Sequence, residues 1–587
     1  MSAPHHSIGA DPNARELGTL PLFALALVVG ALAAAGSIVF LGAIALVQNL
    51  LFHGRIDLFL DPHTALAPSP WGAGVVLVPV LGAFAVTWIT RRLSAEVRGS
   101  GVPEVMYAIH YHGGRMRPRV AGLKALASAL SIGSGASVGR EGPIVQIGAV
   151  LGAAIGFLAR APAHQRVVLV AGAAAAGIAA TFNAPLGGLA FAIELLLISV
   201  SARNVALVAS ASAAATCCAG LLGGFDALFA HLPLPAAEAG GLHQLLLWAP
   251  FGVLAGLAAT ALERGIAGVE DVSSAWIPND YLRHGLAMLI VGLMLYAFVE
   301  RTGQYYVAGI GYPVIEAILA GVLADPAFLF LLFAAKLVAT TLALGTGASG
   351  GVFAPGLFLG AALGAGYGSA MDWLWPALGI DPVVGAMAGM AAVVGATSAA
   401  VVTAVVMVLE LTQGYAAVLP SLLSVSLAYI VRRRLARESI YTLNLARRGR
   451  RVPTGLEASL SGMLDASRVM SADFEVIDHA ELADWQRVRR MGRGARYSLV
   501  AVDGEVVGMA RPAPPHREAD EHTADAIAGD CVLVAPDTGW ATLMRSLQHR
   551  DDRIILVGDS RRPQDLVGII TEREIARAAR DKADLMD

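Results

Sequence analysis

Charged residues are scarce in this chain of 587 residues: Asp, Glu, Lys and Arg make up 15% of it, whereas soluble globular proteins contain about 25%. This argues against a large soluble enzyme. The three cysteines, Cys217, Cys218 and Cys531, are too few for a disulfide framework and lack the spacing of a metal site. The formal net charge of −3 shows no basic excess, so we expect no nucleic-acid partner and no bound metal.

Apolar sequence dominates instead, at 56% hydrophobic residues and a mean hydropathy of +0.63. After a polar N-terminal tail (residues 1–19), runs long enough to cross or enter a bilayer begin near Leu20, Trp71, Val120, Val167, Val205, Leu245, Leu286, Val314, Leu329, Gly356, Val383 and Ala417. Irregular backbone at membrane depth must be covered by protein or line a water-filled cavity. Because glycine interrupts several runs, we expect more than ten helices, many of them tilted or re-entrant.

Arginines cluster directly after the last apolar run. They are Arg432, Arg433, Arg434, Arg437, Arg447, Arg448, Arg450 and Arg451. Basic residues in short loops remain on the cytoplasmic side of a membrane. We therefore expect a multi-pass protein of the cell (inner or plasma) membrane, with the N-terminal tail and the C-terminal part in the cytoplasm.

One glycine-rich apolar stretch, residues 124–156, contains a single charged pair, Arg140 and Glu141, shortly before Pro143. Pro143 suits the first position of a helix, which would place Glu141 in non-helical backbone just before a helix N-terminus. A charge inside a bilayer costs about 3 kcal/mol on insertion scales, so it marks a candidate functional site. The free N–H groups and the dipole at such a terminus suit an anion. The alternative is a structural ion pair between Glu141 and Arg140.

This stretch occurs twice, since residues 336–368 align with residues 124–156 without gaps. Glu141 then falls on Phe353. Upstream, GSGVP at residues 99–103 corresponds to GIGYP at residues 309–313. Two homologous halves with Gly- and Pro-broken apolar segments indicate a transport protein whose site lies at the repeat interface. The sequence leaves open whether the halves are inverted or parallel.

The composition becomes that of a soluble protein after about Gly455. Residues 497–509 contain an Asp-Gly turn between two apolar runs, which predicts a β-hairpin, and a polar, Pro-rich loop follows at residues 512–528. Residues 552–571, followed by a helix from Glu572, predict a second β-β-α unit. Tandem units of this kind resemble a CBS-domain pair at residues 465–582 with a degenerate first copy, joined to the membrane part by a linker at residues 447–464.

The nucleotide-binding CBS pairs place Thr or Ser and Asp at the last strand-helix step. Here Thr571 is present, but Glu574 replaces the Asp, and the first copy has neither residue. We expect no cofactor, with an adenine nucleotide at the CBS pair as the alternative.

The membrane part, residues 20–446, resembles the CLC family of chloride channels and proton-coupled chloride exchangers. Four signatures stand in family order: GSGVPE at residues 99–104, GREGP at 139–143, GVFAP at 351–355, and IYTLNLAR at 440–447. The resemblance implies an all-α polytopic membrane fold made of an inverted repeat of broken helices, followed by the α/β CBS pair. The repeat halves would span about residues 20–230 and 240–446, and the protein would be a homodimer in the lipid bilayer.

The resemblance also implies which residues handle the transported ions. The hydroxyls of Ser100 and Tyr441 and the backbone N–H groups of Val352 and Phe353 would hold the chloride ion. Neutral donors of this kind bind an anion weakly enough to release it, as conduction requires. Glu141 would be the gate: ionised, it can occupy an anion site, and protonated, it is neutral and can move away. Chloride and protons are thus the expected partners.

One departure bears on the type of transport. The exchangers of this family carry a second glutamate, on the intracellular side, that relays the proton, and this chain has Leu195 there. Glu194 is adjacent, but helix geometry turns neighbouring side chains about 100° apart, which leaves Glu194 as a secondary candidate only. We therefore predict a passive chloride channel gated by voltage or pH, with a chloride/proton antiporter as the alternative.

Two other functions, an intramembrane serine protease and a cation transporter, would need residues that the chain lacks. Ser349 lies in a GxSG sequence like that of a serine protease, but no histidine occurs between it and the end of the membrane part, and a nucleophile needs a base within reach. A cation transporter would need acidic groups converging at the helix breaks.

We expect Lys124 and Lys336 at the ends of spans, reaching water. We expect Glu194 and Glu410 to be satisfied polar groups between helices.

Overall fold

The computed structural model describes most of the chain. The described residues are 15–59, 67–224, 228–229, 231–232, 234, 245–450, 452, 466–481, 496–510, 527–528, 531–536, 538–547 and 554–583. The first fourteen residues of the predicted N-terminal tail, most of the predicted linker and nearly all of the polar loop after Pro512 lie outside them. The chain divides into a helical unit, residues 16–109 and 113–452, and a second unit that holds residues 453–587.

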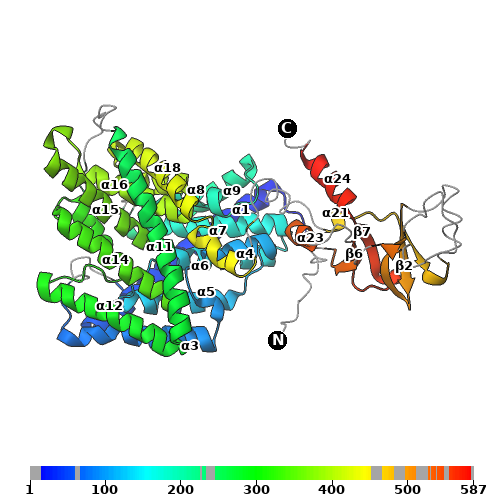
Figure 1. Cartoon of the computed structure of the whole chain (residues 1–587), viewed down its shortest axis with the longest axis horizontal. Coiled ribbons are helices and arrows are strands. Elements are labelled where there is room, and N and C mark those ends of the chain that lie inside the picture. Colours follow the sequence, from blue (N-terminus) through cyan, green and yellow to red (C-terminus); the bar gives the residue numbers. More distant parts are fainter. Residues whose placement is uncertain are drawn as a thin grey trace. The chain divides into compact units, whose positions relative to one another are not determined.

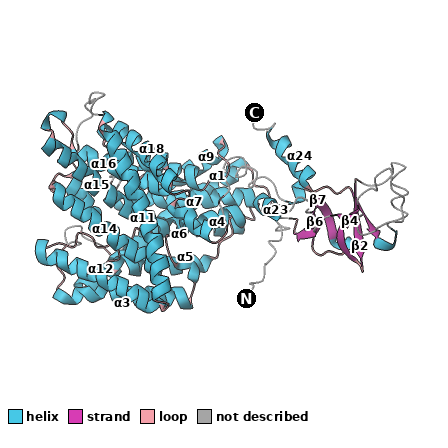
Figure 2. Ribbon diagram, viewed as in Figure 1, coloured by secondary structure: helices cyan, strands magenta, loops and turns pink. Residues whose placement is uncertain are grey.

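The helical unit contains no named strand among its described residues (Figures 1 and 2). Its α-helices are α1 (Thr19–Gln48), α3 (Val78–Arg92), α4 (Val102–Tyr111), α5 (Pro118–Gly133), α6 (Glu141–Leu158), α7 (Ala163–Phe182), α8 (Pro185–Leu195), α9 (Ala202–Gly223), α11 (Trp248–Trp276), α12 (Asp280–Thr302), α13 (Tyr312–Leu319), α14 (Pro326–Thr346), α15 (Phe353–Leu374), α16 (Pro382–Ser398), α17 (Val401–Thr412), α18 (Val418–Leu435) and α19 (Ile440–Arg447). The expectation of more than ten helices is confirmed. No run start marks the short helices α4, α8, α17 and α19 or the longer α6, which the Arg140-Glu141 stretch and Pro143 predicted separately.

The order of these helices repeats. The series α1, α3, α4, α5, α6, α7, α8, α9 corresponds one by one to α11, α12, α13, α14, α15, α16, α17, α18. The short helix α19 follows the second series and has no counterpart among the described elements. Nine helices of the described part are long and apolar enough to cross a bilayer, while α8, α16 and α17 are apolar but shorter. This mixture of long and short apolar helices fits the predicted polytopic fold of broken helices.

Glycines bring the paired helices of each half into close contact. In the second half, a Cβ added at Gly389 on α16 would lie 2.0 Å from the backbone oxygen of Gly360 on α15. In the first half, a Cβ at Gly148 on α6 would lie 2.3 Å from the backbone oxygen of Ala173 on α7. Small residues allow such backbone contact between membrane helices. The recurrence of glycine in both repeats therefore follows from helix packing.

The second unit holds all the named strands of the described chain (Figure 2). They are β1 (Phe474–Asp478), β2 (Tyr497–Val502), β3 (Glu505–Ala510), β4 (Ile527–Ala528), β5 (Cys531–Val534), β6 (Ile554–Gly558) and β7 (Leu566–Ile570), with the helices α21 (Ala466–Val469), α23 (Trp540–Leu547) and α24 (Glu572–Ala583). One sheet has the order β1-β2-β3-β4 and the other β5-β6-β7. The predicted hairpin is confirmed, since β2 and β3 are antiparallel and Asp503 and Gly504 both have positive φ, as a two-residue type I′ turn requires.

The two sheets repeat one topology. In each, a parallel strand precedes an antiparallel pair: β1 pairs with β2, and β5 pairs with β6. Apolar residues of both sheets, including Leu499, Leu556 and Ile569, share one core. The sequence predicted the antiparallel pairs β2–β3 and β6–β7 and the helix α24 but missed β1 and β5. It also missed β4, which pairs with β3 at the end of the expected polar loop. A parallel partner has no turn signal, because its connection is longer than a hairpin.

We predict that Gly389→Ala destabilises the helical unit, because the added methyl group would force α15 and α16 apart. Overpacking of this kind costs about 1–3 kcal/mol. Thermal unfolding of the purified protein in detergent should show a lower midpoint. Gly268→Ala is the matched control on α11, where a Cβ would meet nothing within 4 Å. Equal midpoints for the two variants would contradict the close contact.

Candidate functional site

The two glycine-rich loops of the repeat meet in the interior of the helical unit. The N–H of Gly139 donates to the carbonyl of Gly351 at 2.7 Å, and the N–H of Gly351 donates to the carbonyl of Gly139 at 2.6 Å. These two glycines are repeat equivalents, so this reciprocal pair is antiparallel and has local two-fold symmetry. Because α6 and α15 begin directly after the loops, their N-termini lie beside each other.

Glycine is required where the loops touch. A Cβ at Gly142 would lie 1.9 Å from the backbone oxygen of Ser100, which places the loop carrying Ser100 against the first turn of α6. A Cβ at Gly139 would lie 2.1 Å from Glu141 Oε2 and 3.2 Å from the backbone nitrogen of Ala354. Three backbone segments and one carboxylate thus converge on a space that no larger residue could share.

Glu141 is the first residue of α6, and Arg140, with helical backbone angles, is the N-cap. The expectation that Pro143 opens the helix and that Glu141 lies in non-helical backbone is therefore wrong. A proline is tolerated anywhere in the first turn, since the N–H groups there have no partner within the helix. The helix can therefore begin two residues before the proline.

The Glu141 side chain is 4% exposed and accepts a hydrogen bond from the hydroxyl of Tyr312, 2.7 Å from Oε1. Within the described residues it forms no ion pair with Arg140, so the structural-pair alternative is not supported. The Arg140 guanidinium instead lies over the ring of Tyr312, 4.9 Å from its centroid, and over that of Phe182, at 5.4 Å. The carboxylate is thus held by a neutral donor.

Two cavities adjoin this point. The first holds about 270 Å³ of space not filled by atoms and is lined by Glu141, Thr403 and Met407, among others. The second holds about 180 Å³ and is lined by Val352, with Thr397 and Ser398 on α16. Phe353 and Tyr441 line both cavities, so these two side chains stand between them.

The structure therefore brings four of the predicted residues together. Glu141, Phe353 and Tyr441 share the first cavity, and Val352 lies in the adjoining one. Ser100 is close by through its backbone at Gly142, but it is not among the residues that line these two cavities. Among the described residues, no group hydrogen-bonds to the Tyr441 hydroxyl, although the side chain is only 3% exposed.

The comparison with known families decides what this arrangement belongs to. A family profile described as voltage gated chloride channel, Voltage_CLC, matches residues 82–433, more than half of the chain. The chain belongs to the CLC family. It is therefore a membrane chloride-transport protein and not an enzyme, as the sequence predicted.

Individual CLC relatives extend this match. The H(+)/Cl(-) exchange transporter ClcA of Vibrio cholerae is 33% identical over 439 residues, which cover 72% of this chain and 88% of the relative. The ClcA of Vibrio parahaemolyticus is 32% identical over 394 residues, covering 64% of this chain and 80% of the relative. The putative chloride channel protein ClcB-like of Ralstonia nicotianae is 31% identical over 392 residues, covering 64% and 86%.

Solved CLC structures share the fold. A slow cyanobacterial Cl-/H+ antiporter superposes with a TM-score of 0.63 at 25% identity, over 73% of this chain and 97% of that one. A eukaryotic CLC transporter superposes with a TM-score of 0.61 at 20% identity, over 94% of this chain and 98% of that one. The second match shows the fold alone, but its coverage extends into the CBS-like unit.

The two buried lysines of this CLC chain differ from expectation. Lys124 and Lys336 are 0% exposed and do not reach water, so the prediction that they lie at span ends is wrong. Lys124 Nζ donates to the carbonyls of Val97 and Gly99, at 2.8 and 2.5 Å. Lys336 Nζ donates to the carbonyls of Val307 and Gly309, at 3.1 and 2.8 Å. Carbonyls freed by irregular backbone at membrane depth need donors, and each lysine supplies one.

The glutamates near the ends of α8 and α17 each cap the start of the other helix. Glu194 accepts from the backbone of Val402 and Thr403 and from the Thr403 hydroxyl, at 2.9, 2.7 and 2.6 Å. Glu410 accepts from the backbone of Leu186 and Gly187, at 2.9 and 2.6 Å. Carboxylates stabilise helix N-termini in this way. Both glutamates are thus satisfied polar groups between helices, as predicted.

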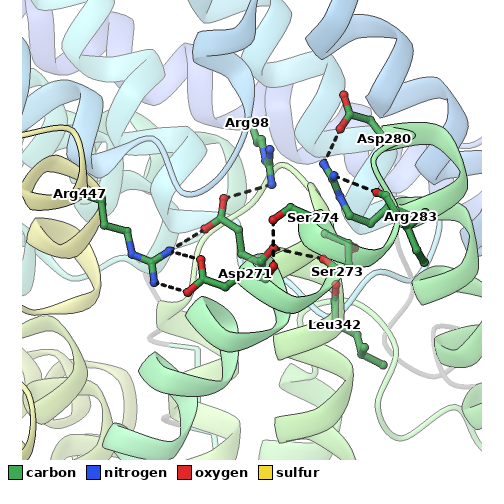
Figure 3. Close-up of polar contacts among 11 residues, drawn as sticks. Arg98, Asp271, Ser273, Ser274, Asp280, Arg283, Leu342 and Arg447 are labelled. Atoms are coloured by element: carbon green, nitrogen blue, oxygen red, sulfur yellow. Dashed lines mark hydrogen bonds and ion pairs between the residues drawn. The ribbon is translucent and has the colours of Figure 1, made fainter.

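An ion-pair cluster ties together the segments that carry Ser100 and Tyr441 (Figure 3). Arg98, just before the Ser100 loop, pairs with Glu270 of α11 at 3.3 Å. Arg447, at the end of the Tyr441 helix α19, pairs with Glu270 at 3.6 Å and with Asp271 at 3.0 Å. The pairs are partly exposed, so each contributes about 0–1 kcal/mol. Their effect is to link both segments to α11.

Ser349 does not support the protease reading. Its hydroxyl donates to the carbonyl of Val97 at 2.7 Å and lies 2.9 Å from the hydroxyl of Ser128, and the residue is fully buried. Among the described residues, no histidine contacts it. Its role is to join the loops of the two repeats.

Two contributors to the site are not predicted by the sequence: the contact of Tyr312 and the buried position of the lysine pair. The GIGYP segment was recognised as a repeat of GSGVP, and the tyrosine that replaces Val102 there was the available signal. Hydropathy alone predicts lysines at the ends of spans. Their repeat-equivalent positions, together with the nearby glycine loops, could have suggested a common buried role.

We predict that Lys124→Met destabilises the protein by about 1.5–3 kcal/mol, because two buried carbonyls would lose a charged donor. A lower thermal unfolding midpoint in detergent should report the loss. Arg117→Met is the control, since Arg117 precedes the same helix and its side chain is 83% exposed. A Lys124→Met protein as stable as the control would contradict the structural role of this side chain.

Proposed function

We propose that this CLC protein conducts chloride passively through a pathway gated by Glu141. The observation that carries the proposal is the position of the Glu141 carboxylate: it is buried in one cavity with Phe353 and Tyr441, and the N-termini of α6 and α15 meet there. Two helix dipoles direct positive potential to one point. An anion and the carboxylate would compete for it.

Chloride would be bound by neutral groups. Phe353 and Tyr441 line both cavities, Val352 lines the second, and the Ser100 loop touches the first turn of α6. The donors would be the Tyr441 hydroxyl and the backbone N–H groups of Val352 and Phe353. The first N–H groups of a helix have no intrahelical partner. Such donors bind an anion without the strong hold of a direct ion pair, so the ion can leave again.

The gate would operate by protonation. An ionised Glu141 occupies the positive point itself and excludes chloride. A protonated Glu141 carries no charge, loses most of its attraction to the helix ends and leaves the path open. Acidification would therefore raise chloride flux.

Passive conduction is supported by the inner side of the pathway. Leu195 cannot carry a proton, and its neighbour Glu194 is engaged by three hydrogen bonds at the start of α17. These three bonds fix the Glu194 side chain at the start of α17 and occupy both of its oxygens.

The second candidate is chloride/proton exchange, which the names of the Vibrio relatives favour. One contact offers a route for the proton. The Thr403 hydroxyl donates to Glu194, and Thr403 also lines the cavity that contains Glu141. A proton entering at Glu194 could reach Glu141 along this line without Leu195.

We propose that the second unit does not bind an adenine nucleotide. Thr571 and Glu574 satisfy each other at the start of α24: the Thr571 N–H and hydroxyl donate to Glu574 Oε2 at 3.2 and 2.5 Å. The Tyr497 hydroxyl donates to Glu574 Oε1 at 2.6 Å, and partial burial together with this bond raises the pKa of Tyr497. The Arg573 N–H in turn donates to the Thr571 hydroxyl at 3.3 Å. Thr571 and Glu574 thus cap the start of α24, and this uses the groups that would contact a ribose.

We propose a homodimer of the cell membrane, with the CBS-like unit in the cytoplasm. The arginines at the end of α18, Arg432, Arg433 and Arg434, support this orientation, since basic residues after a span favour the cytoplasmic side.

The type of transport can be read from reversal potentials. Purified protein in liposomes should give a reversal potential that follows the chloride gradient and ignores an opposed proton gradient. Protein-free liposomes are the control. Protons driven uphill by chloride would instead establish exchange, and in that case Glu194→Gln should abolish the proton movement and leave chloride flux.

We predict that Glu141→Gln gives chloride flux that is high and independent of pH, because the amide is neutral throughout. Flux would be measured as chloride efflux from liposomes between pH 4 and pH 8. Glu316→Gln is the matched control, since this glutamate is partly exposed and pairs with His231. A Glu141→Gln protein that keeps the wild-type pH profile would refute the gate.

A further inference from the structure

The hydroxyl of Tyr312 is the only side-chain group of the described residues that hydrogen-bonds to Glu141. Both residues are buried, at 9% and 4% exposure. Tyr312 is the first residue of α13, and it follows Gly311, whose φ of +89° turns the chain into this helix. The contact therefore joins the start of a second-half helix to the carboxylate at the start of α6.

The tyrosine ring is held firmly. The rings of Phe182 and Phe229 each meet it edge-on, with centroids 6.2 Å away, and the Arg140 guanidinium covers one face. Lys336 anchors the chain just before it through the carbonyls of Val307 and Gly309. Aromatic and cation–π contacts of this kind restrict a ring. The hydroxyl is thus presented in one place, without reorganisation.

The contact between Tyr312 and Glu141 has no counterpart at the equivalent positions of the two repeats. Tyr312 corresponds to Val102 of the first half, and Glu141 corresponds to Phe353 of the second. Val102 and Phe353 line the same first cavity as Glu141. One cross-repeat pair is therefore an acid with its donor, and the equivalent pair is apolar. The tyrosine thus occurs only in the repeat position that contacts the Glu141 carboxylate.

We propose that Tyr312 is a positioning residue that holds ionised Glu141 in the anion-excluding position. The inference rests on the gating function proposed above. A hydrogen bond to a carboxylate is charge-assisted and strengthens when the acid is ionised. The bond therefore stabilises the closed state and must break before the side chain can leave. Tyr312 would set both the flux at neutral pH and the pH at which the pathway opens.

Few other groups can influence this equilibrium. The titratable and charged side chains that face Glu141 within the described structure are Arg140 beside it, Tyr312 on α13 and Tyr441 on α19. Arg140 lies over the Tyr312 ring, and the Tyr441 hydroxyl makes no hydrogen bond to Glu141. Removing the Tyr312 hydroxyl alone therefore tests the contact while the ring, its packing and the neighbouring charges stay.

We predict that Tyr312→Phe raises chloride efflux at pH 7 about tenfold and moves the pH midpoint of efflux upward by about one unit, since a bond to the charged form is lost. Tyr306→Phe is the matched control. Tyr306 is also buried and packs on Phe298 and Phe328, away from Glu141. A Tyr312→Phe profile that coincides with the control would overturn the proposal.

The double variant Tyr312→Phe/Glu141→Gln separates this proposal from the gate itself. If Glu141→Gln is independent of pH and adding Tyr312→Phe changes nothing further, Tyr312 acts through Glu141, as proposed. If Tyr312→Phe raises efflux equally with and without Glu141, its effect comes from packing and the positioning role is refuted. If Glu141→Gln itself retains the pH profile, the gating function fails, whatever Tyr312→Phe does.

Discussion

Two backbone hydrogen bonds between Gly139 and Gly351 are the constraint on which the rest of the helical unit depends. They join equivalent points of the two repeats and so place the N-termini of α6 and α15 side by side. Helix ends inside a membrane expose unpaired N–H groups, which are costly unless they meet a partner. In the proposed function, an anion or the Glu141 carboxylate would satisfy them. The chemistry of the site is thus a consequence of how the repeats touch.

The same need for partners explains the buried charges around the site. Lys124 and Lys336 each supply donors to a glycine-rich loop, and Glu194 and Glu410 each supply acceptors to a helix start. Every one of these groups has an equivalent in the other repeat. Charged residues in a bilayer are expensive, and here each is fixed by at least two hydrogen bonds. The result is a rigid frame of repeat-related polar contacts.

Function enters where the repeat symmetry fails. Glu141 stands opposite Phe353, Tyr312 stands opposite Val102, and Tyr441 lies on α19, which extends the second half alone. A symmetric frame therefore supports an asymmetric site, with one acid, one donor to that acid and one free hydroxyl. In the proposed function, it is at these positions that the two repeats differ in ion chemistry.

Much of this protein was determined by its sequence. Hydropathy predicted a polytopic protein of more than ten helices and located most of the longer ones, the gapless repeat indicated two halves, and motif order identified the CLC family. The Asp503-Gly504 turn fixed one hairpin of the second unit. These features are local or periodic, so they can be read along the chain.

Only the tertiary structure decided which groups meet. The bond from Tyr312 to Glu141 joins residues 171 positions apart, and the caps at α8 and α17 join residues more than 200 apart. Hydropathy predicted Lys124 and Lys336 at the membrane surface, because a hydropathy scale contains no information about the backbone carbonyls that bind the two buried ammonium groups. The local sequence pattern also predicted that α6 begins at Pro143, two residues after its actual first residue, Glu141. In each case the deciding partner came from a distant part of the chain, and a partner far along the chain leaves no local mark in the sequence.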